Sequence, residues 1–211
     1  MSDSKPVEEV PVENVEGENV DEDPDWVTLF FVAMLGDDGV GKTAIKNSIA
    51  RHIYEPKNPT TSLQYAIKNG EKNLPPDSTI SYLKLDSEKW IRLEVWEQPK
   101  DTPIKEYDVL RTSSAMFIYD VTNPKSFESI PALVERVRAD ATRILPSWNH
   151  QLMLVGNKWD LKSQGGEMVC SDKAKAFADE NGMLFREVSA VDGTGIKESF
   201  KALIESIYEN M

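Results

Sequence analysis

The hydrophobic residues of this chain fall into two alternating patterns. Residues 28–35 form a nearly continuous apolar run, which is typical of a strand buried on both faces. Glycines follow it, and then a helical pattern covers residues 42–52. The strand pattern returns in four later segments, at residues 91–95, 115–119, 151–155 and 183–188.

Helical periodicity fills the stretches between the later strands. Asn123-Pro124 is typical of an N-cap followed by proline at the first helical position, and apolar residues at helical spacing follow at 127–137. Ser171 is expected to cap a helix through Ala178, and residues 196–207 form the apolar face of a last helix. Because strands alternate with helices, the sequence predicts an α/β fold with a parallel sheet covered on both sides.

The acidic residues are distributed unevenly. The net charge is −12, and residues 1–25 hold ten acids against one base. That segment has no aromatic residue and cannot bury enough apolar surface to offset its ordering entropy. We therefore expect a disordered acidic tail at 1–25 and a folded domain at 26–211. The tail is either a solubilising segment or, through its valines, a short linear motif.

Composition excludes several classes of function. A chain this acidic is a poor candidate for binding the phosphate backbone of nucleic acid. The single cysteine, Cys170, allows neither an intrachain disulfide nor a cysteine-rich metal site, and the two histidines do not suggest a zinc site. No apolar run approaches the roughly 20 residues of a membrane-spanning helix. No signal segment is visible at the start. The expectation is a cytoplasmic protein.

A phosphate-binding motif follows the first predicted strand. Gly36-Asp37-Asp38-Gly39-Val40-Gly41-Lys42-Thr43 fits G-x-x-x-x-G-K-[ST] between a strand and a helix. The glycines let the backbone wrap a phosphate, and the helix start aims N–H groups at it. Lys42 would neutralise the β- and γ-phosphates, and the Thr43 hydroxyl would bind Mg²⁺. The predicted phosphate-binding residues are Asp38, Gly39, Val40, Gly41, Lys42, Thr43 and Ala44.

Two further motifs indicate which nucleotide base the chain would bind. Asn157-Lys158-Trp159-Asp160 follows the strand at 151–155. Asp160 can accept hydrogen bonds from the paired N1–H and N2–H₂ donors of guanine, which adenine lacks on that edge. Asn157 can hold neighbouring loops, and the alkyl stem of Lys158 can cover one face of the ring. The second motif, Glu187-Val188-Ser189-Ala190, ends the next strand.

These three motifs, in this order and each at the end of a strand, resemble the Ras superfamily of small GTPases over about residues 28–208. Residues 119–127 and 176–182 look like the Rab branch. The resemblance implies a small G domain of the P-loop NTPase fold, with a mostly parallel six-stranded sheet, that binds GTP or GDP with Mg²⁺. It also implies that Ala190 offers its N–H to guanine O6, that Ser189 shapes that loop, and that Tyr54 packs against the base.

The same resemblance implies a switch I threonine that reaches Mg²⁺ and the γ-phosphate. Ungapped spacing from Thr43 makes Thr61 the expected Mg²⁺ ligand, and the dipeptide Pro59-Thr60, which resembles the family's Pro-Thr, keeps Thr60 as the alternative. A third alternative is that neither binds metal, since residues 62–64 match no family pattern.

Switch II departs from the family pattern Trp-Asp-Thr-Ala-Gly-Gln-Glu at every position after Trp96. Glu97 stands for the Asp that holds Mg²⁺ through water. Lys100 stands for the Gly that meets the γ-phosphate, after a stiff Pro99. Asp101 stands for the catalytic Gln that orients the attacking water. Losing one such stabilising group commonly costs about 10²–10³ in rate, so hydrolysis is expected to be weak or absent.

Two segments bear on partners. Residues 68–79 lengthen the expected link between the second and third strands, either as a tolerated surface loop or, with switch I, as a contact for effector or regulator proteins. The chain stops at Met211 without a C-terminal cysteine motif or basic stretch. Either it is truncated or it encodes no membrane anchor of its own, in which case a partner would bring it to a membrane.

Three functions compete at this point. The first is a Rab-like guanine-nucleotide-binding switch or binding module with weak or absent hydrolysis. The second is an active GTPase with a variant switch II, working alone or with a partner's arginine. The third is a scaffold without nucleotide, which the intact motifs argue against. An ATP kinase would leave Asn157 and Asp160 without a role.

Overall fold

The computed structural model describes residues 26–52, 79–84, 90–99 and 102–210. Its centre is a six-stranded sheet in the order β2-β3-β1-β4-β5-β6. Strand β2 is antiparallel to β3, and the other neighbours are parallel. This confirms the mostly parallel sheet predicted from the sequence. The strands are β1 (Trp26–Leu35), β2 (Thr79–Lys84), β3 (Trp90–Glu97), β4 (Ser114–Asp120), β5 (Gln151–Asn157) and β6 (Leu184–Glu187).

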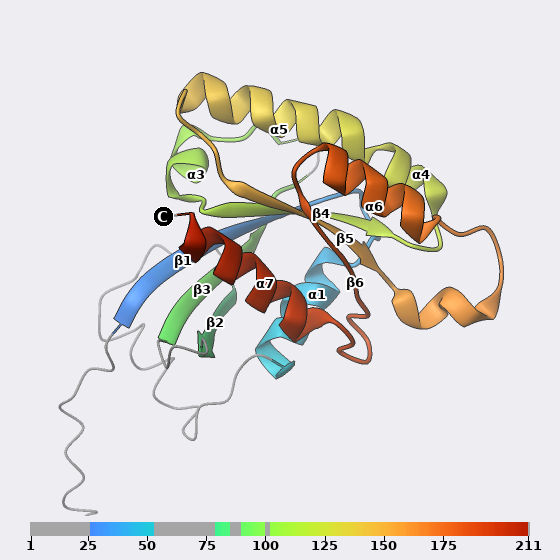
Figure 1. Ribbon diagram of the computed structural model, residues 1–211. Coiled ribbons are helices and arrows are strands. Elements are labelled where there is room, and N and C mark those ends of the chain that lie inside the picture. The colour runs from blue at the N-terminus through green and yellow to red at the C-terminus, as the bar shows by residue number, and fades with distance from the viewer. Residues whose placement is uncertain (1–25, 53–78, 85–89, 100–101, 211) are drawn as a thin grey trace, which may run out of the picture.

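Helices cover both faces of the sheet (Figure 1), with α1 and α7 on one face and α3, α4, α5 and α6 on the other. Their bounds are α1 (Lys42–His52), α3 (Glu106–Arg111), α4 (Pro124–Glu128), α5 (Ile130–Ile144), α6 (Ser171–Glu180) and α7 (Ile196–Glu209). A 3-10 helix, η1 (Trp159–Gln164), follows β5. No helix in the described ranges is long and apolar enough to cross a membrane.

The alternation of side chains along the strands builds a separate hydrophobic core on each face. In β4, Met116 and Ile118 pack into the core shared with α1 and α7. Ala115, Phe117 and Tyr119 pack into the core on the opposite face, below α4, α5 and α6. Because all seven residues of β4 are buried, the strand is apolar almost throughout, as expected for a central parallel strand.

The helix expected through residues 127–137 is two helices. α4 ends at Glu128 and α5 begins at Ile130, with Ser129 between them. Pro131 lies in the first turn of α5, where its missing N–H costs nothing, whereas inside one continuous helix it would remove a hydrogen bond. Asn123 is the N-cap of α4, as predicted, although its side chain makes no capping hydrogen bond.

Two other expectations were wrong. Ser171 is the first residue of α6 rather than its cap, a position that Cys170 holds, and the Ser171 hydroxyl donates instead to Glu187 at 2.7 Å. Residues 68–79 do not link the second and third strands. The strand that pairs with β3 begins at Thr79, so residues 85–89 form that link and the longer segment precedes β2.

The fold directs several chain segments to one edge of the sheet. The parallel strands β1, β3, β4, β5 and β6 all end at this edge, and the chain leaves β1 and β4 toward opposite faces, into α1 and α4. Open α/β sheets bind ligands in the crevice at such a point. All three sequence motifs begin at this edge.

Candidate functional site

The loop after β1 has a backbone that two glycines make possible. Gly36 and Gly41 have positive φ angles of 150° and 95°. A Cβ on Gly36 would lie 2.2 Å from the carbonyl oxygen of Ile118, and one on Gly41 would lie 2.3 Å from Nδ2 of Asn157. At Gly39, with φ 79°, a Cβ would meet no atom of the described residues within 4 Å. The loop is therefore packed tightly against β4 and β5 at its two ends and open at Gly39.

The side chain of Lys42 is hydrogen-bonded to the backbone of this loop. Its Nζ donates hydrogen bonds to the carbonyl oxygens of Gly36 at 2.9 Å and Asp37 at 2.8 Å. Lys42 is also the first residue of α1, whose first turn contains no acidic residue. A fixed ammonium beside free helix N–H groups forms a site suited to an anion such as phosphate. Asp38 and Ala44 are exposed at the same place.

Thr43 meets the end of β3. Its hydroxyl donates to Oε2 of Glu97 at 2.9 Å, and Nζ of Lys46 lies 2.7 Å from Oε1 of the same carboxylate. The structure thus brings Thr43 beside the residue that stands for the Asp of the family's switch II. These two oxygen groups are 54 positions apart in the chain.

The donor set at this corner fits Mg²⁺. The described residues contain no group of three or more His, Cys, Asp or Glu that could enclose a metal. Mg²⁺ needs no such cage, because it keeps several waters and is bound through one or two protein oxygens plus phosphates. The Thr43 hydroxyl would hold it directly and the Glu97 carboxylate through water, and the bound ion would neutralise phosphate charge.

Asn157 joins the two halves of the site. Its Nδ2 donates to the carbonyl oxygen of Val40 in the phosphate loop at 2.9 Å. Its Oδ1 accepts the backbone N–H of Ala190, after β6, at 3.2 Å. The side chain is buried, with 1% of the residue exposed, so both hydrogen bonds are shielded from water. This bears out the expectation that Asn157 holds neighbouring loops.

Lys158 is held by an acid at the end of β4. Its Nζ lies 2.6 Å from Oδ2 of Asp120, and its backbone is left-handed, with φ 68°. Burial by itself would raise the pKa of Asp120, but hydrogen bonds from Lys158 and Thr122 and the charge of Lys158 hold that pKa below its ordinary value. The ion pair therefore restrains the side chain of Lys158, and its role beside a nucleotide base stays a prediction.

Asp160 and Ser189 also come together. The Ser189 hydroxyl donates to Oδ1 of Asp160 at 2.7 Å, which fixes the carboxylate while leaving lone pairs for further donors. The resemblance assigned the N–H of Ala190 to guanine O6, whereas here it donates to Asn157. Between Lys158 and Asp160, Trp159 has its ring 3.4 Å below the Lys162 ammonium.

The start of switch II is held locally. The N–H of Gln98 donates to the Met34 carbonyl, and its Nε2 donates to the Thr102 carbonyl at 3.0 Å. Gln98 is buried, with 4% exposed. Several predicted residues lie outside the described ranges, namely Tyr54, Thr60, Thr61, Lys100 and Asp101, as do residues 68–78.

Sequence reasoning gave no role to three residues that shape this site. Lys46 pairs with Glu97, Asp120 pairs with Lys158, and Gln98 anchors the chain after β3. A signal for Lys46 was present, because residues three apart on a helix share a face and Thr43 was already placed toward the metal. The partner of Lys46 could not be read from spacing alone.

Together the fold and these contacts define a P-loop nucleotide-binding protein of the α/β class. Comparison with known proteins narrows that class. The family model described as "Ras family" matches residues 31–209, and the chain belongs to this family. It is 28% identical over 187 residues to the Ras-related protein RABA4b of Arabidopsis thaliana, which covers 87% of this chain and 74% of that protein. It is thus a Rab-like small GTPase of the Ras superfamily.

Proposed function

We propose that this chain binds GTP or GDP together with Mg²⁺ and serves as a regulatory switch or binding module. The main support is the side chain of Asn157. Its amide bonds both the phosphate loop, at Val40, and the loop after β6, at Ala190, and so holds the two loops together. Lys42 supplies the charge for the phosphates, and the Asp160 carboxylate, fixed by Ser189, is the acceptor for guanine. Family membership supports the same ligand.

Selectivity for guanine tests this assignment. A site built to make hydrogen bonds rejects an analogue that lacks them by about 10⁴–10⁵. Unlabelled GTP should therefore displace labelled GDP at low concentration, whereas ATP should displace it only at very high concentration. Asp160→Asn should weaken this preference. An amide replaces one of the two acceptor oxygens with an NH₂ donor, so it cannot face the paired N1–H and N2–H₂ of guanine with two oxygens. Equal competition by ATP and GTP would contradict the proposal.

We further propose that intrinsic hydrolysis is weak or absent. The support comes from the sequence after β3, where Lys100 and Asp101 replace the family's Gly and Gln, and from Gln98, which ties this segment to Thr102. The alternative is an active GTPase with a variant switch II. The contact between Thr43 and Glu97 favours it, since it keeps oxygen ligands at the metal corner.

The nucleotide that co-purifies with the protein separates these alternatives. Bound GTP would support weak hydrolysis, and bound GDP would support an active enzyme. We place the protein in the cytoplasm, where effector or regulator proteins would contact switch I and residues 68–79. The net charge of −12 argues against nucleic acid as a partner.

A further inference from the structure

Lys46 adds a positive charge to the corner of the site where Mg²⁺ would bind. It lies one helical turn after Thr43 on α1, and both side chains reach the same carboxylate at the end of β3. Nζ of Lys46 is 2.7 Å from Oε1 of Glu97, and the Thr43 hydroxyl is 2.9 Å from Oε2. Each oxygen of Glu97 thus has a partner within this corner.

The ion pair is largely shielded from solvent. The side chains of Lys46 and Glu97 are 10% and 18% exposed. Salt and water screen such a pair less than a surface pair, so the charge of Lys46 acts on its surroundings more strongly than that of an exposed lysine. Two effects on a metal follow. The ammonium repels a nearby divalent cation, and it compensates the carboxylate that would otherwise attract one.

We propose that Lys46 lowers the affinity of the nucleotide-loaded site for Mg²⁺, and that the protein consequently retains its nucleotide with little dependence on Mg²⁺. This inference rests on the proposed binding of guanine nucleotide. Lys46 is a positioning residue here, because it acts through Glu97 and through its charge. The metal ligands remain the Thr43 hydroxyl, water and phosphate oxygens.

The test measures the Mg²⁺ affinity of the full chain loaded with GDP. Metal is first removed with EDTA, and Mg²⁺ is then titrated while the release of a fluorescent GDP analogue is followed. Lys46→Gln keeps a polar side chain and removes the charge, so it should bind Mg²⁺ about tenfold more tightly than the natural protein. EDTA should then accelerate GDP release more in Lys46→Gln than in the natural protein. Lys46→Arg keeps the charge and should behave like the natural protein.

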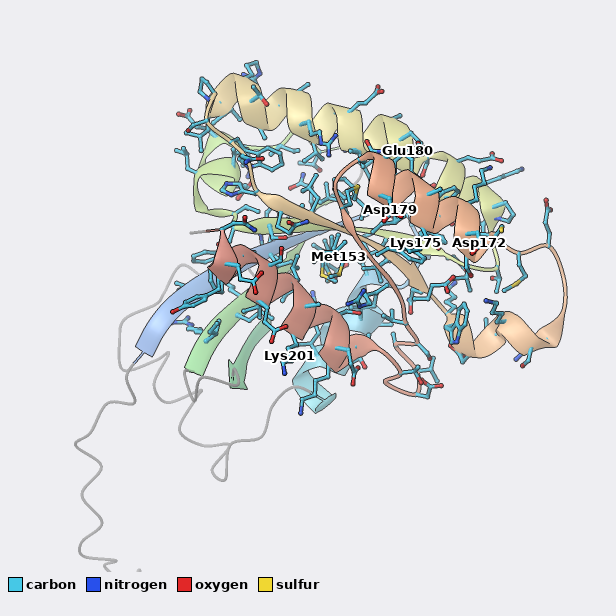
Figure 2. All side chains as sticks on the ribbon, in the orientation of Figure 1. Met153, Asp172, Lys175, Asp179, Glu180 and Lys201 are labelled. Carbon is cyan, nitrogen blue, oxygen red and sulfur yellow. The ribbon has the colours of Figure 1, made fainter. Side chains whose placement is uncertain are left out.

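A second variant separates charge from damage to the fold. Glu97→Gln removes the carboxylate beside Lys46 and keeps the lysine charge, so it should weaken Mg²⁺ binding, opposite in direction to Lys46→Gln. Simple loosening of the corner would weaken binding in both. Lys175→Gln is a control for the same substitution at an exposed ion pair. It breaks another lysine ion pair, with Asp179 at 2.6 Å, on α6 across the sheet from α1 (Figure 2), and should leave the Mg²⁺ affinity unchanged.

Removing Lys46 leaves the partly buried Glu97 carboxylate without this charged partner, which can destabilise the domain. The double variant Lys46→Gln/Glu97→Gln avoids that cost, because it leaves two neutral amides. It should bind Mg²⁺ more tightly than Glu97→Gln alone. Equal Mg²⁺ affinity in these two variants, or in Lys46→Gln and the natural protein, would overturn the inference. The proposed function would still stand, provided that these proteins bind GDP. A protein that binds no GDP under any condition would overturn the proposed function, and this inference with it.

Discussion

At the scale of single residues, Lys42 has a double role that the loop geometry explains. Its ammonium donates to two backbone carbonyls of the loop in which it stands. Those bonds fix the side chain before any phosphate arrives, so binding does not have to immobilise a long flexible side chain. The same bonds mean that a change at Lys42 affects both the loop and the ligand.

Lys42→Ala should therefore lower GDP affinity and remove most of the thermal stabilisation that GDP–Mg²⁺ provides. A ligand present at roughly a thousandfold excess over its Kd adds about 4 kcal/mol to the free energy of unfolding. Melting curves with and without GDP–Mg²⁺ measure this. Lys125→Ala, on α4, is a control of the same residue type. An unchanged ligand-induced shift in Lys42→Ala would separate the phosphate loop from nucleotide binding.

Asp120 gives a pH dependence whose sign follows from its pKa. Its contacts with Lys158 and Thr122 hold the pKa below the ordinary value of 3.8, so the ionised form stabilises the folded state above about pH 4. That contribution should be lost as the pH falls below 3.8 toward the lowered pKa. Asp120→Asn should therefore be less stable than the natural protein at pH 6, and the difference should shrink in acid.

Urea unfolding of both proteins at several pH values between 3 and 6 measures this difference directly. The comparison isolates Asp120, because every other titrating group is common to the two proteins. A difference in stability that stays constant from pH 6 to pH 3 would show that the ion pair with Lys158 does not stabilise the fold.

At the scale of elements, the local pattern of apolar residues predicted those strands and helices whose formation depends mainly on that pattern. The 3.6-residue period placed α1 at its observed bounds, and the continuous apolar runs found β1, β4 and β5. It could not place contacts between distant segments. Glu97 and Lys46, or Asn157 and Val40, meet only because the sheet brings the ends of β3 and β5 to α1 and its loop. Patterning also missed the break at Ser129, where Pro131 outweighs an unbroken helical period.

The segment that follows β3 leads to a prediction about GTP hydrolysis. Intrinsic GTP hydrolysis should be very slow, and Asp101→Gln alone should not restore it. Lys100 replaces a glycine whose backbone other residues adopt with difficulty, and Pro99 stiffens the approach. Repair should need Glu97→Asp, Lys100→Gly and Asp101→Gln together, with non-additive effects, because such residues act as a unit.

Single-turnover release of phosphate from protein preloaded with GTP measures this series. The single and triple variants are compared with the unaltered chain under the same conditions. Rapid hydrolysis by the unaltered chain would favour the active-GTPase alternative. A large gain from Asp101→Gln alone would show that the backbone already has the required path and that only the side chain was lacking.

At the scale of the whole molecule, the negative charge is concentrated in residues 1–25, which precede the described residues. Residues 1–25 hold ten acids and one base, so nine of the twelve net negative charges lie there. Deleting this segment should leave GDP affinity and melting temperature nearly unchanged, because it has little apolar surface to bury. Melting curves and GDP titrations of the shortened and full chains check this. A drop of several degrees would mean that the segment packs on the domain.

The position of Trp159 gives the protein an optical reporter of its own. The ring lies beneath the Lys162 ammonium, and Trp159 stands in the chain between Lys158 and Asp160, the two residues proposed to contact the base. Indole emission responds to nearby charge and to local rearrangement, so nucleotide binding at the neighbouring Lys158 and Asp160 should alter its intensity. Comparing natural and Trp159→Phe protein during a GDP titration would subtract the constant emission of the other tryptophans, of which the chain has five in all. Arrival and departure of an unlabelled ligand could then be timed in stopped flow.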